Sequence, residues 1–356
     1  MATLTRLVMT GPAPAARGGL ASVIAAYRAH GLFERWPIDY VAADLKAPAR
    51  VAALLAQHRR IVLHVHTAAR PGFWRAAWCA GAALAARCPV ILHLHGGGFE
   101  RFYDASNLAA QALMRFLLEH AACVAVPSQL LAGWVHSVSP AVRATLLPNP
   151  VELPVLQATP RPNLVLFLGS LHREKGIFDL LEALSQLRAA VPDVRLVCAG
   201  EGERGPVMRY AERLGIADAV KFTGWVGPSG RRVLLESAAV YAQPSYADGM
   251  PMSLLEAMAA AVPVVASTAG GTAEVLVDGT SGLLVAPGDC ATLQRLLRKL
   301  LLDRKLAARI GAAGRETVRA RFSAEHAVPR LEAIYAGIGL SQTGIHSSPW
   351  PASQAG

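Results

Sequence analysis

The chain has 356 residues, of which 53% are apolar and only 17% are charged. This balance excludes a chain that is disordered over most of its length, and the length predicts two domains because one core rarely organises so many residues. The formal net charge is +10, and residues 1–150 carry most of it, with 14 Lys+Arg against 6 Asp+Glu. Such an excess favours anionic partners: nucleic acid, an acidic membrane surface or phosphorylated ligands.

The five cysteines form no C-x-x-C pair, and their odd number fits no complete disulfide framework. This usage is typical of a reducing, cytosolic compartment. The first residues contain no basic region followed by a long apolar run, so a signal peptide is not expected. No apolar stretch is long enough to span a bilayer, which leaves attachment to a membrane surface open.

Short apolar runs typical of strands alternate with longer Ala- and Leu-rich runs typical of helices. The predicted strands are residues 5–10, 61–66, 90–95, 122–126, 164–169, 194–199, 219–223, 239–243, 263–266 and 283–285. The predicted helices include residues 18–29, 72–87, 107–120, 176–190, 205–214, 251–261 and 290–312. Uniformly apolar strands between helices indicate parallel sheets covered on both faces, so the predicted fold class is α/β and doubly wound.

The domain boundary is predicted at residues 148–163, where five of the sixteen residues are proline. We therefore expect one Rossmann-like domain over residues 1–155 and a second over residues 160–320. Residues 321–340 are expected to form a C-terminal helix that packs back on the first domain. The polar segment 341–356 predicts a disordered tail.

Ligands of open α/β sheets bind beyond the carboxyl ends of the strands. One such loop, PSYADGMPMSLLE at residues 244–256, leads into a helix with Pro251 in its first turn, and a helix start can hold a phosphate. Asp248 lies in the loop and Glu256 eight positions later, so both carboxylates can flank a ligand and accept sugar hydroxyls. The alternative is an Asp in an ordinary turn and a solvated helix Glu.

Two further loops have the composition of phosphate-binding segments. FLGSLHREKG brings Arg173 and Lys175 to the start of a helix, where two cations suit a diphosphate better than a structural role. TGPAPAARGG places Gly18 and Gly19 after the first strand, where backbone can approach a ligand closely. A solvent-facing charged loop and an ordinary turn are the respective alternatives.

Two H-x-H strings contain His64 and His66, then His93 and His95. If their strands are neighbours the four imidazoles converge, but no nearby Cys or acidic residue completes a zinc site. Hydrogen bonding of the inner histidines within the sheet is therefore favoured over a metal. His95 ends its strand before three glycines, and we expect it to contact a ligand.

Residues 200–205 read GEGERG, a literal dinucleotide fingerprint. It follows a strand in the second half of the chain, and no acidic residue clearly ends the next strand, so the signal is weak. The sequence contains no Walker motif and no D-x-D. The basic first half contains no nucleic-acid-binding motif, and nucleic acid is not expected as a partner.

Together these strings resemble the retaining glycosyltransferases of family four, which have the GT-B fold, and among them the bacterial exopolysaccharide and capsule enzymes. The matching strings are FLGSLHREKGIFDLLEAL, LVCAGEGE, VKFTGWV, PSYADGMPMSLLEAMAAAVPVVAS, GGTAEVLVDGTSGLLVAPGD, GPAPAARGGLASV, VLHVHTA, ILHLHGGGF and LPNPV. The resemblance covers roughly residues 5–335. It implies two Rossmann-like domains facing each other across a cleft, with the acceptor bound by the first and a sugar-nucleotide donor by the second.

The resemblance also implies roles for individual residues. The family's carboxylate pair falls on Asp248, toward the transferred sugar, and on Glu256, toward the ribose. Lys175 matches a lysine that neutralises the diphosphate, while the usual arginine is Ser170 here and Arg173 is its expected replacement. The implied catalytic residues are His95, Asp248, Lys175 and Arg173. The implied donor-binding residues are Gly18, Gly19, Gly200, Gly202, Val226, Gly249, Met250, Pro251, Met252 and Glu256.

The implied activity is retaining, metal-independent transfer of a hexose from a UDP- or GDP-sugar, with no cofactor. The implied acceptor is a glycan or a polyprenyl-diphosphate-linked oligosaccharide, in exopolysaccharide, lipopolysaccharide or capsule synthesis. The cytoplasm is the expected location, at the inner face of an anionic membrane. Two alternatives stay open: a catalytically silent sugar-nucleotide-binding protein, because Ser170 and Asp248 depart from the family pattern, and an NAD-dependent oxidoreductase.

Overall fold

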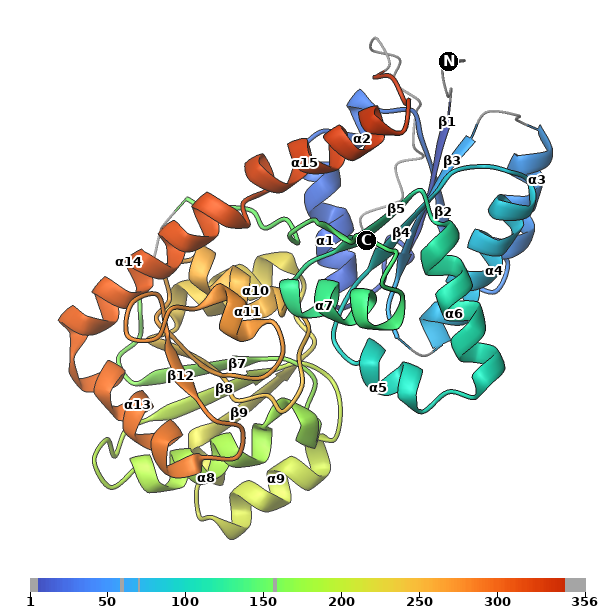
Figure 1. Cartoon of the computed structure of the whole chain (residues 1–356). Helices are drawn as coiled ribbons and strands as arrows, with labels where there is room; N and C mark the ends of the chain where they lie inside the picture. Colours follow the sequence, from blue (N-terminus) through green and yellow to red (C-terminus); the bar gives the residue numbers. More distant parts are fainter. Residues whose placement is uncertain (1–5, 58–60, 70, 156–158, 343–356) are drawn as a thin grey trace.

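The computed structural model describes residues 6–57, 61–69, 71–155 and 159–342. The chain forms two six-stranded parallel sheets, each covered by helices and each belonging to one half of the molecule (Figure 1). The predicted α/β, doubly wound fold class is confirmed. The predicted tail 341–356 lies, beyond residue 342, outside the described residues.

The first sheet has the strand order β2-β1-β3-β4-β5-β6. Its strands are β1 Arg6–Gly11, β2 Ile38–Ala42, β3 Ile61–Thr67, β4 Val90–Leu94, β5 Cys123–Val126 and β6 Thr145–Leu146. Its helices are α1 Gly19–Ala29, α2 Leu32–Arg35, α3 Ala47–Gln57, α4 Pro71–Ala85, α5 Phe99–Asp104, α6 Leu108–His120 and α7 Gln129–Val138. The winding direction of the chain reverses between β1 and β3.

The second sheet has the order β12-β11-β10-β7-β8-β9. Its strands are β7 Leu164–Leu168, β8 Arg195–Ala199, β9 Val220–Gly224, β10 Val240–Gln243, β11 Val264–Ser267 and β12 Leu283–Val285. Its helices are the 3₁₀ turns η1 Arg173–Lys175 and η2 Ala217–Ala219, with α8 Ile177–Leu187, α9 Arg204–Arg213, α10 Pro228–Ser237, α11 Met252–Ala259, α12 Thr272–Val275, α13 Cys290–Leu302 and α14 Arg304–Arg321. Here the winding reverses between β7 and β10, so the loops after β1, β7 and β10 lie where ligands of this architecture bind.

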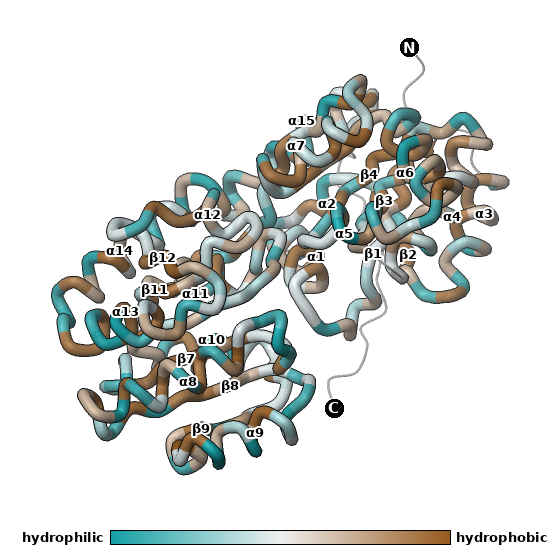
Figure 2. The backbone as a smooth tube through the Cα atoms, turned by 60° about the horizontal axis from the view of Figure 1, so that its bottom comes forward, coloured by the Kyte–Doolittle hydropathy of each residue, from teal (hydrophilic) through white to brown (hydrophobic). Residues whose placement is uncertain are grey.

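The strands bury their side chains on both faces. Every residue of β3, β4 and β7 is buried, which is the pattern of a parallel sheet between two helical layers. Figure 2 shows hydrophobic residues concentrated in β7 and β8, while hydrophobic and hydrophilic residues alternate along the outer helix α13. One buried apolar cluster includes residues from both sheets, so the core continues from one domain into the other.

The end of the described chain returns to the first domain. Helix α15, Ala324–Gly337, follows α14 and lies beside α2 and α1 (Figure 1). The rings of Trp36 and Tyr335 lie 5.2 Å apart, edge to face. Glu332 accepts hydrogen bonds from Arg35 Nε at 2.7 Å and from Trp36 Nε1 at 3.1 Å. These contacts tie α15 to the domain that holds β1.

The predicted single helix 290–312 is wrong. The structure has two helices there, and the Asp303 side chain accepts a hydrogen bond from the Leu306 N–H at 2.9 Å. Asp satisfies the free N–H groups at a helix start, so it ends α13 and begins α14. Strands β2 and β6 were not predicted. None of the described helices is both long and apolar enough to cross a membrane.

Candidate active site

A cavity of about 520 Å³ lies between the two sheets, at the carboxyl ends of their strands. Its lining comes from both domains, and its volume falls in the range of small-molecule sites. The loops after β1, β7 and β10 all reach it. The two winding reversals therefore face one shared space, which is the position in which this architecture binds ligands.

Two helices begin at the cavity wall. Helix α1 begins at Gly19 and α11 at Met252, and a Cβ added at Gly19 would lie 3.2 Å from Met252 Cγ. The first N–H groups of a helix have no partner within it, and its dipole favours negative charge there. Two such starts from opposite domains therefore make one wall of the cavity suitable for an anion.

The loop that contains Asp248 fits closely against glycines of both domains. A Cβ on Gly249 would lie 2.2 Å from the Gly97 nitrogen of the first domain. A Cβ on Gly270, which has φ +60°, would lie 1.5 Å from the Asp248 carbonyl oxygen. Only glycine permits both the close approach and the left-handed backbone. These contacts fix the position of the Asp248 backbone at the cavity wall.

The Asp248 carboxylate is held by one donor on each oxygen. Lys175 Nζ lies 2.9 Å from Oδ1, and Gln243 Nε2 donates to Oδ2 at 2.8 Å. The Asp248 side chain is 13% exposed and that of Lys175 is 30% exposed. Gln243 ends β10 and Lys175 ends η1, so the fold itself orients the carboxylate toward the cavity.

Glu256, in the second turn of α11, forms an ion pair with Arg231 of α10, whose Nε lies 3.1 Å from Oε2. Burial raises the pKa of Glu256 to about 7, although the Arg231 charge opposes the shift. Near neutral pH the carboxyl group is therefore present in both its protonated and its ionised form. The ionised form is a strong acceptor for hydroxyl groups of a ligand.

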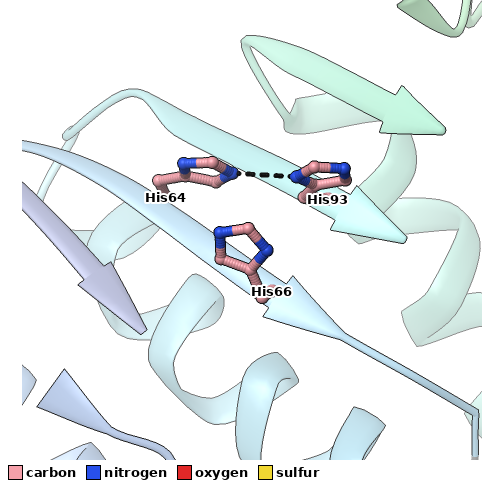
Figure 3. A group of neighbouring side chains, drawn as sticks. All are labelled: His64, His66 and His93. Atoms are coloured by element: carbon pink, nitrogen blue, oxygen red, sulfur yellow. Dashed lines mark hydrogen bonds between the residues drawn. The ribbon is translucent and has the colours of Figure 1, made fainter. Parts of the chain in front are cut away.

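The four histidines lie together within the first sheet, because β3 and β4 are neighbours with His66 paired to His93. His64 Nε2 and His93 Nδ1 lie 3.2 Å apart and share a hydrogen bond (Figure 3). His66 Nδ1 and His95 Nε2 share another at 2.8 Å. Burial is the main cause that lowers the pKa of His64 and His95 to about 3, so the imidazoles are neutral at neutral pH.

His64, His66 and His93 offer ring nitrogens within 4.8 Å of one another, a spacing that could hold a metal ion. In the structure, however, His64 is hydrogen-bonded at both nitrogens, to Tyr335 Oη at 2.7 Å and to His93. The inner histidines thus hydrogen-bond within the sheet. The set that the described residues offer contains imidazoles alone, without carboxylate or thiolate.

Most of the sequence-derived site residues lie around this one cavity. Its lining includes His95, Lys175, Asp248, Glu256, Gly18, Gly19, Gly200, Val226, Gly249, Met250, Pro251 and Met252. Arg173 does not line it, because its guanidinium lies 5.1 Å from the ring centroid of Phe178. Gly202 does not line the cavity either, and its backbone pairs with Leu171.

Sequence reasoning missed several lining residues that act through partners distant in the chain. Arg231 and Gln243 hold the two carboxylates, and nothing in their local sequence marks them. Arg17, beside the glycine pair, forms an ion pair with Glu201 and lies 4.7 Å from the ring centroid of Trp225, so it connects the two domains across the cavity. Asn149, within LPNPV, donates to the Met250 carbonyl oxygen at 3.4 Å.

The comparisons with known proteins agree with this geometry. Residues 5–150 match the family model for the glycosyl transferase 4-like domain, and residues 152–317 match the model for glycosyl transferases group 1. Phosphatidyl-myo-inositol mannosyltransferase of Mycobacterium leprae is 34% identical over 207 residues, which are 56% of this chain and 54% of that protein. Putative glycosyltransferase EpsD of Bacillus subtilis is 33% identical over 173 residues, 48% and 45% of the two chains. The chain spans about half the length of these curated relatives.

Among solved structures, HepE of Anabaena in complex with UDP superposes with a TM-score of 0.75 and 17% identity, over 93% of this chain and all of that one. Two domains with facing parallel sheets and two matching domain models define a GT-B protein. The chain belongs to the family-four glycosyltransferases, with a glycosyl transferase 4-like domain followed by a group 1 domain. The oxidoreductase alternative, which rested on GEGERG and the α/β pattern, is therefore set aside.

Proposed function

We propose that the protein is a retaining glycosyltransferase that moves a hexose from a UDP- or GDP-sugar to a glycan or a polyprenyl-diphosphate-linked acceptor. The process served is the synthesis of exopolysaccharide or another cell-surface polysaccharide. The observation that carries the proposal is the convergence, in one cavity between the domains, of two helix starts, Lys175 and the carboxylates of Asp248 and Glu256. Each of these groups can bind one part of a nucleoside-diphosphate sugar: the diphosphate, the ribose or the hexose.

The diphosphate is assigned to the wall formed by Lys175, Gly18, Gly19 and the starts of α1 and α11. These groups supply one cation and free N–H donors without a metal ion, and fixed dipoles stabilise charge that develops on a leaving group. The proposal therefore includes metal-independent catalysis and no cofactor. Arg173 contributes only if it leaves its position over the ring of Phe178.

Glu256 is assigned to the ribose and Asp248 to the transferred hexose. Both are carboxylates that a neighbouring cation holds in place, and ionised carboxylates accept hydrogen bonds from paired hydroxyls. His95 is assigned to the hexose as a neutral hydrogen-bonding group, because it lines the cavity, burial lowers its pKa, and His66 holds its Nε2. Gly200 and Val226 border the nucleoside.

In the proposed reaction the bond between the sugar carbon and the diphosphate oxygen breaks. The acceptor hydroxyl attacks that carbon from the face that the diphosphate leaves, and the departing phosphate oxygen takes the hydroxyl proton. Configuration is retained, and no side-chain nucleophile is required. Lys175 and the helix starts hold the charge on the nucleoside diphosphate, while the two domains exclude water from the cavity.

The names of similar proteins support the donor and acceptor classes. HepE was solved with UDP, and the mannosyltransferase acts on phosphatidyl-myo-inositol, a lipid acceptor. A catalytically silent sugar-nucleotide-binding protein is the second candidate. It is favoured by Ser170 and Asp248, the two positions at which the site departs from the family pattern. Binding of a donor without turnover would distinguish it.

A thermal-shift panel of UDP, GDP, ADP, CMP and NAD, with EDTA or with magnesium, tests the proposal. A ligand at about 100 times its dissociation constant stabilises the folded protein by about 2.7 kcal/mol. We expect UDP or GDP to raise Tm in EDTA. A shift with NAD alone, a shift that needs magnesium, or no shift with any nucleotide would contradict it.

A further inference from the structure

Strand β3 holds both the backbone and the ring of His95. The backbone N–H of His95 donates to the Thr67 carbonyl oxygen at 2.7 Å, which continues the pairing of β3 with β4 past the end of β4. Its ring Nε2 lies 2.8 Å from Nδ1 of His66, which is on β3. The ring of His93 packs beside it, with 3.9 Å between the centroids. His95 therefore has one position at the cavity wall, and its action on a ligand depends on which ring nitrogen carries the proton.

The imidazoles of His66 and His95 are both neutral. They are 4% and 5% exposed, and burial is the main cause that lowers the pKa of each, that of His95 to about 3. A neutral imidazole has one N–H donor and one bare nitrogen that accepts. The hydrogen bond between the two rings can therefore run in only two directions, and each direction fixes the proton positions of both rings.

The side chain of Asn149 favours donation from His66 to His95. Asn149 lines the cavity, and it raises the pKa of His95 in opposition to burial, as an amide oxygen does when it faces an imidazole N–H. Its amide nitrogen donates to the Met250 carbonyl oxygen, which leaves the amide oxygen for His95. Because His66 engages Nε2, the N–H that faces Asn149 is the one at Nδ1. Nε2 of His95 then accepts from His66.

The opposite direction leaves two polar groups in unfavourable surroundings. If His95 donated from Nε2, its bare Nδ1 would face the amide oxygen of Asn149, and two acceptors would meet. His66 would then carry its proton on Nε2, an atom that is buried and has no hydrogen-bond partner among the described residues. A buried N–H without a partner is costly and rare. The favoured direction avoids both, because it gives the Nδ1–H of His95 an acceptor.

We propose that His66 is a positioning residue that fixes the proton of His95 on Nδ1, so that His95 presents a hydrogen-bond donor to the cavity. The donor meets an oxygen of the transferred hexose. That assignment rests on the proposed function, whereas the position of the proton does not. His66 is not part of the cavity lining, so it acts on a ligand only through His95.

A second histidine pair in the same strands provides a matched control. His64 and His93 lie two residues further from the carboxyl ends of β3 and β4, are buried and hydrogen-bond to each other (Figure 3). Neither is part of the cavity lining. Removing His64 therefore disturbs the core of the first domain to a similar extent but leaves the bond from His66 to His95 in place.

The first test is ¹⁵N NMR of the ligand-free protein, which distinguishes a protonated ring nitrogen from a bare one. Difference spectra against His95→Gln assign the His95 signals. His66→Asn keeps a side-chain N–H near the position of Nδ1, whereas His66→Leu removes the donor. We expect a proton on Nδ1 of His95 in the parent chain, in His66→Asn and in His64→Leu, and a mixture of both tautomers in His66→Leu.

The second test is calorimetric titration of the same proteins, which compares UDP with UDP-glucose and GDP with GDP-mannose. Loss of one hydrogen bond between uncharged groups weakens binding by about two- to tenfold. His66→Leu should weaken binding of the sugar nucleotide by that factor and leave binding of the nucleoside diphosphate unchanged. His66→Asn and His64→Leu should keep the ratio of the two affinities that the parent chain has.

Three results would overturn the positioning role. They are a proton on Nε2 of His95 in the parent chain, a loss of sugar-nucleotide affinity in His64→Leu equal to that in His66→Leu, and unchanged His95 signals or unchanged sugar-nucleotide affinity in His66→Leu. The first is measured on the parent chain and decides the matter even where a variant does not fold. If no sugar nucleotide binds the parent chain, the proposed function fails, while the NMR result still decides where the proton of His95 lies.

Discussion

Replacing Glu256 by Gln should make the free protein more stable while it weakens nucleotide binding. The pKa of Glu256 is raised from 4.5 to about 7 by burial, so the folded protein keeps a proton that the unfolded chain loses within that range. Stability therefore falls as pH rises from about 4.5 through 7, by about 3 kcal/mol in total. The glutamine side chain carries no charge at any of these pH values, so the variant does not undergo this fall in stability.

At pH 8 the Glu256→Gln variant should be about 1–3 kcal/mol more stable than the parent chain, because the uncharged amide avoids the net cost of burying an ionised carboxylate beside Arg231. Near pH 5 the difference should shrink to about 1 kcal/mol or less. Nucleotide binding should change in the opposite direction, since a hydrogen bond to a charged group contributes about 1.5–3 kcal/mol. The expected loss of affinity is about 10- to 150-fold.

Urea denaturation at pH 5 and pH 8 measures the first effect, and calorimetric titration with the nucleotide that binds measures the second. Glu316→Gln is the control, because Glu316 is exposed on α14 and Arg319 lowers its pKa. If the Glu256→Gln variant were less stable than the parent chain at pH 8, the conclusion that burial of the ionised Glu256 destabilises the folded protein would be refuted. Unchanged nucleotide affinity would refute the assignment of Glu256 to the donor.

Three further substitutions, one of them with a matched control, probe the site and the histidine cluster beneath it. Lys175→Ala should weaken nucleoside diphosphate binding by about tenfold or more in calorimetry but leave the nucleoside unaffected; an equal loss for both would place the diphosphate elsewhere. Gly270→Ala should lower Tm and remove the UDP or GDP shift, because its Cβ would overlap the Asp248 carbonyl, whereas Gly279→Ala, also at positive φ but with open space, should lower Tm only slightly and keep the shift. Tyr335→Phe should cost about 1 kcal/mol or more in urea denaturation, because the hydroxyl bonded to His64 is lost, and an unchanged midpoint would show that this bond contributes nothing.

Most of the strands that sequence reasoning predicted, such as 61–66 and 164–169, are buried on both faces, although the predicted strand 219–223 is a half-exposed edge strand. The uniform apolarity of the buried strands is a direct consequence of two covering layers. Strand β2, Ile38–Ala42, was missed because it lies at the sheet edge and only Val41 is fully buried. The break at Asp303 was missed because the apolar periodicity continues on both sides, and only the capping contact shows it.

The residues of the site also fall into two groups, those that the sequence marks and those that only the fold reveals. Asp248 and Lys175 stand in loops with a recognisable composition, so the sequence marks them. Arg231 and Gln243 do not, because they matter only through the carboxylates beside which the fold places them. Arg173 was expected in the site because its loop is basic and because the family's usual arginine is Ser170 here. In the structure its guanidinium packs over the ring of Phe178. This contact depends on where the fold places Phe178, which the loop composition does not show.

The stereochemistry of donor cleavage tests the proposed enzyme most directly. The chain is incubated with UDP- and GDP-hexoses in EDTA, nucleoside diphosphate release is followed, and NMR identifies the anomer formed first. We expect release from one donor class, strong reduction in Lys175→Ala, and a first-formed sugar with the configuration of the donor. An inverted anomer, release that requires a divalent metal, or release that is unaffected by Lys175→Ala would contradict retaining, metal-independent transfer in this cavity.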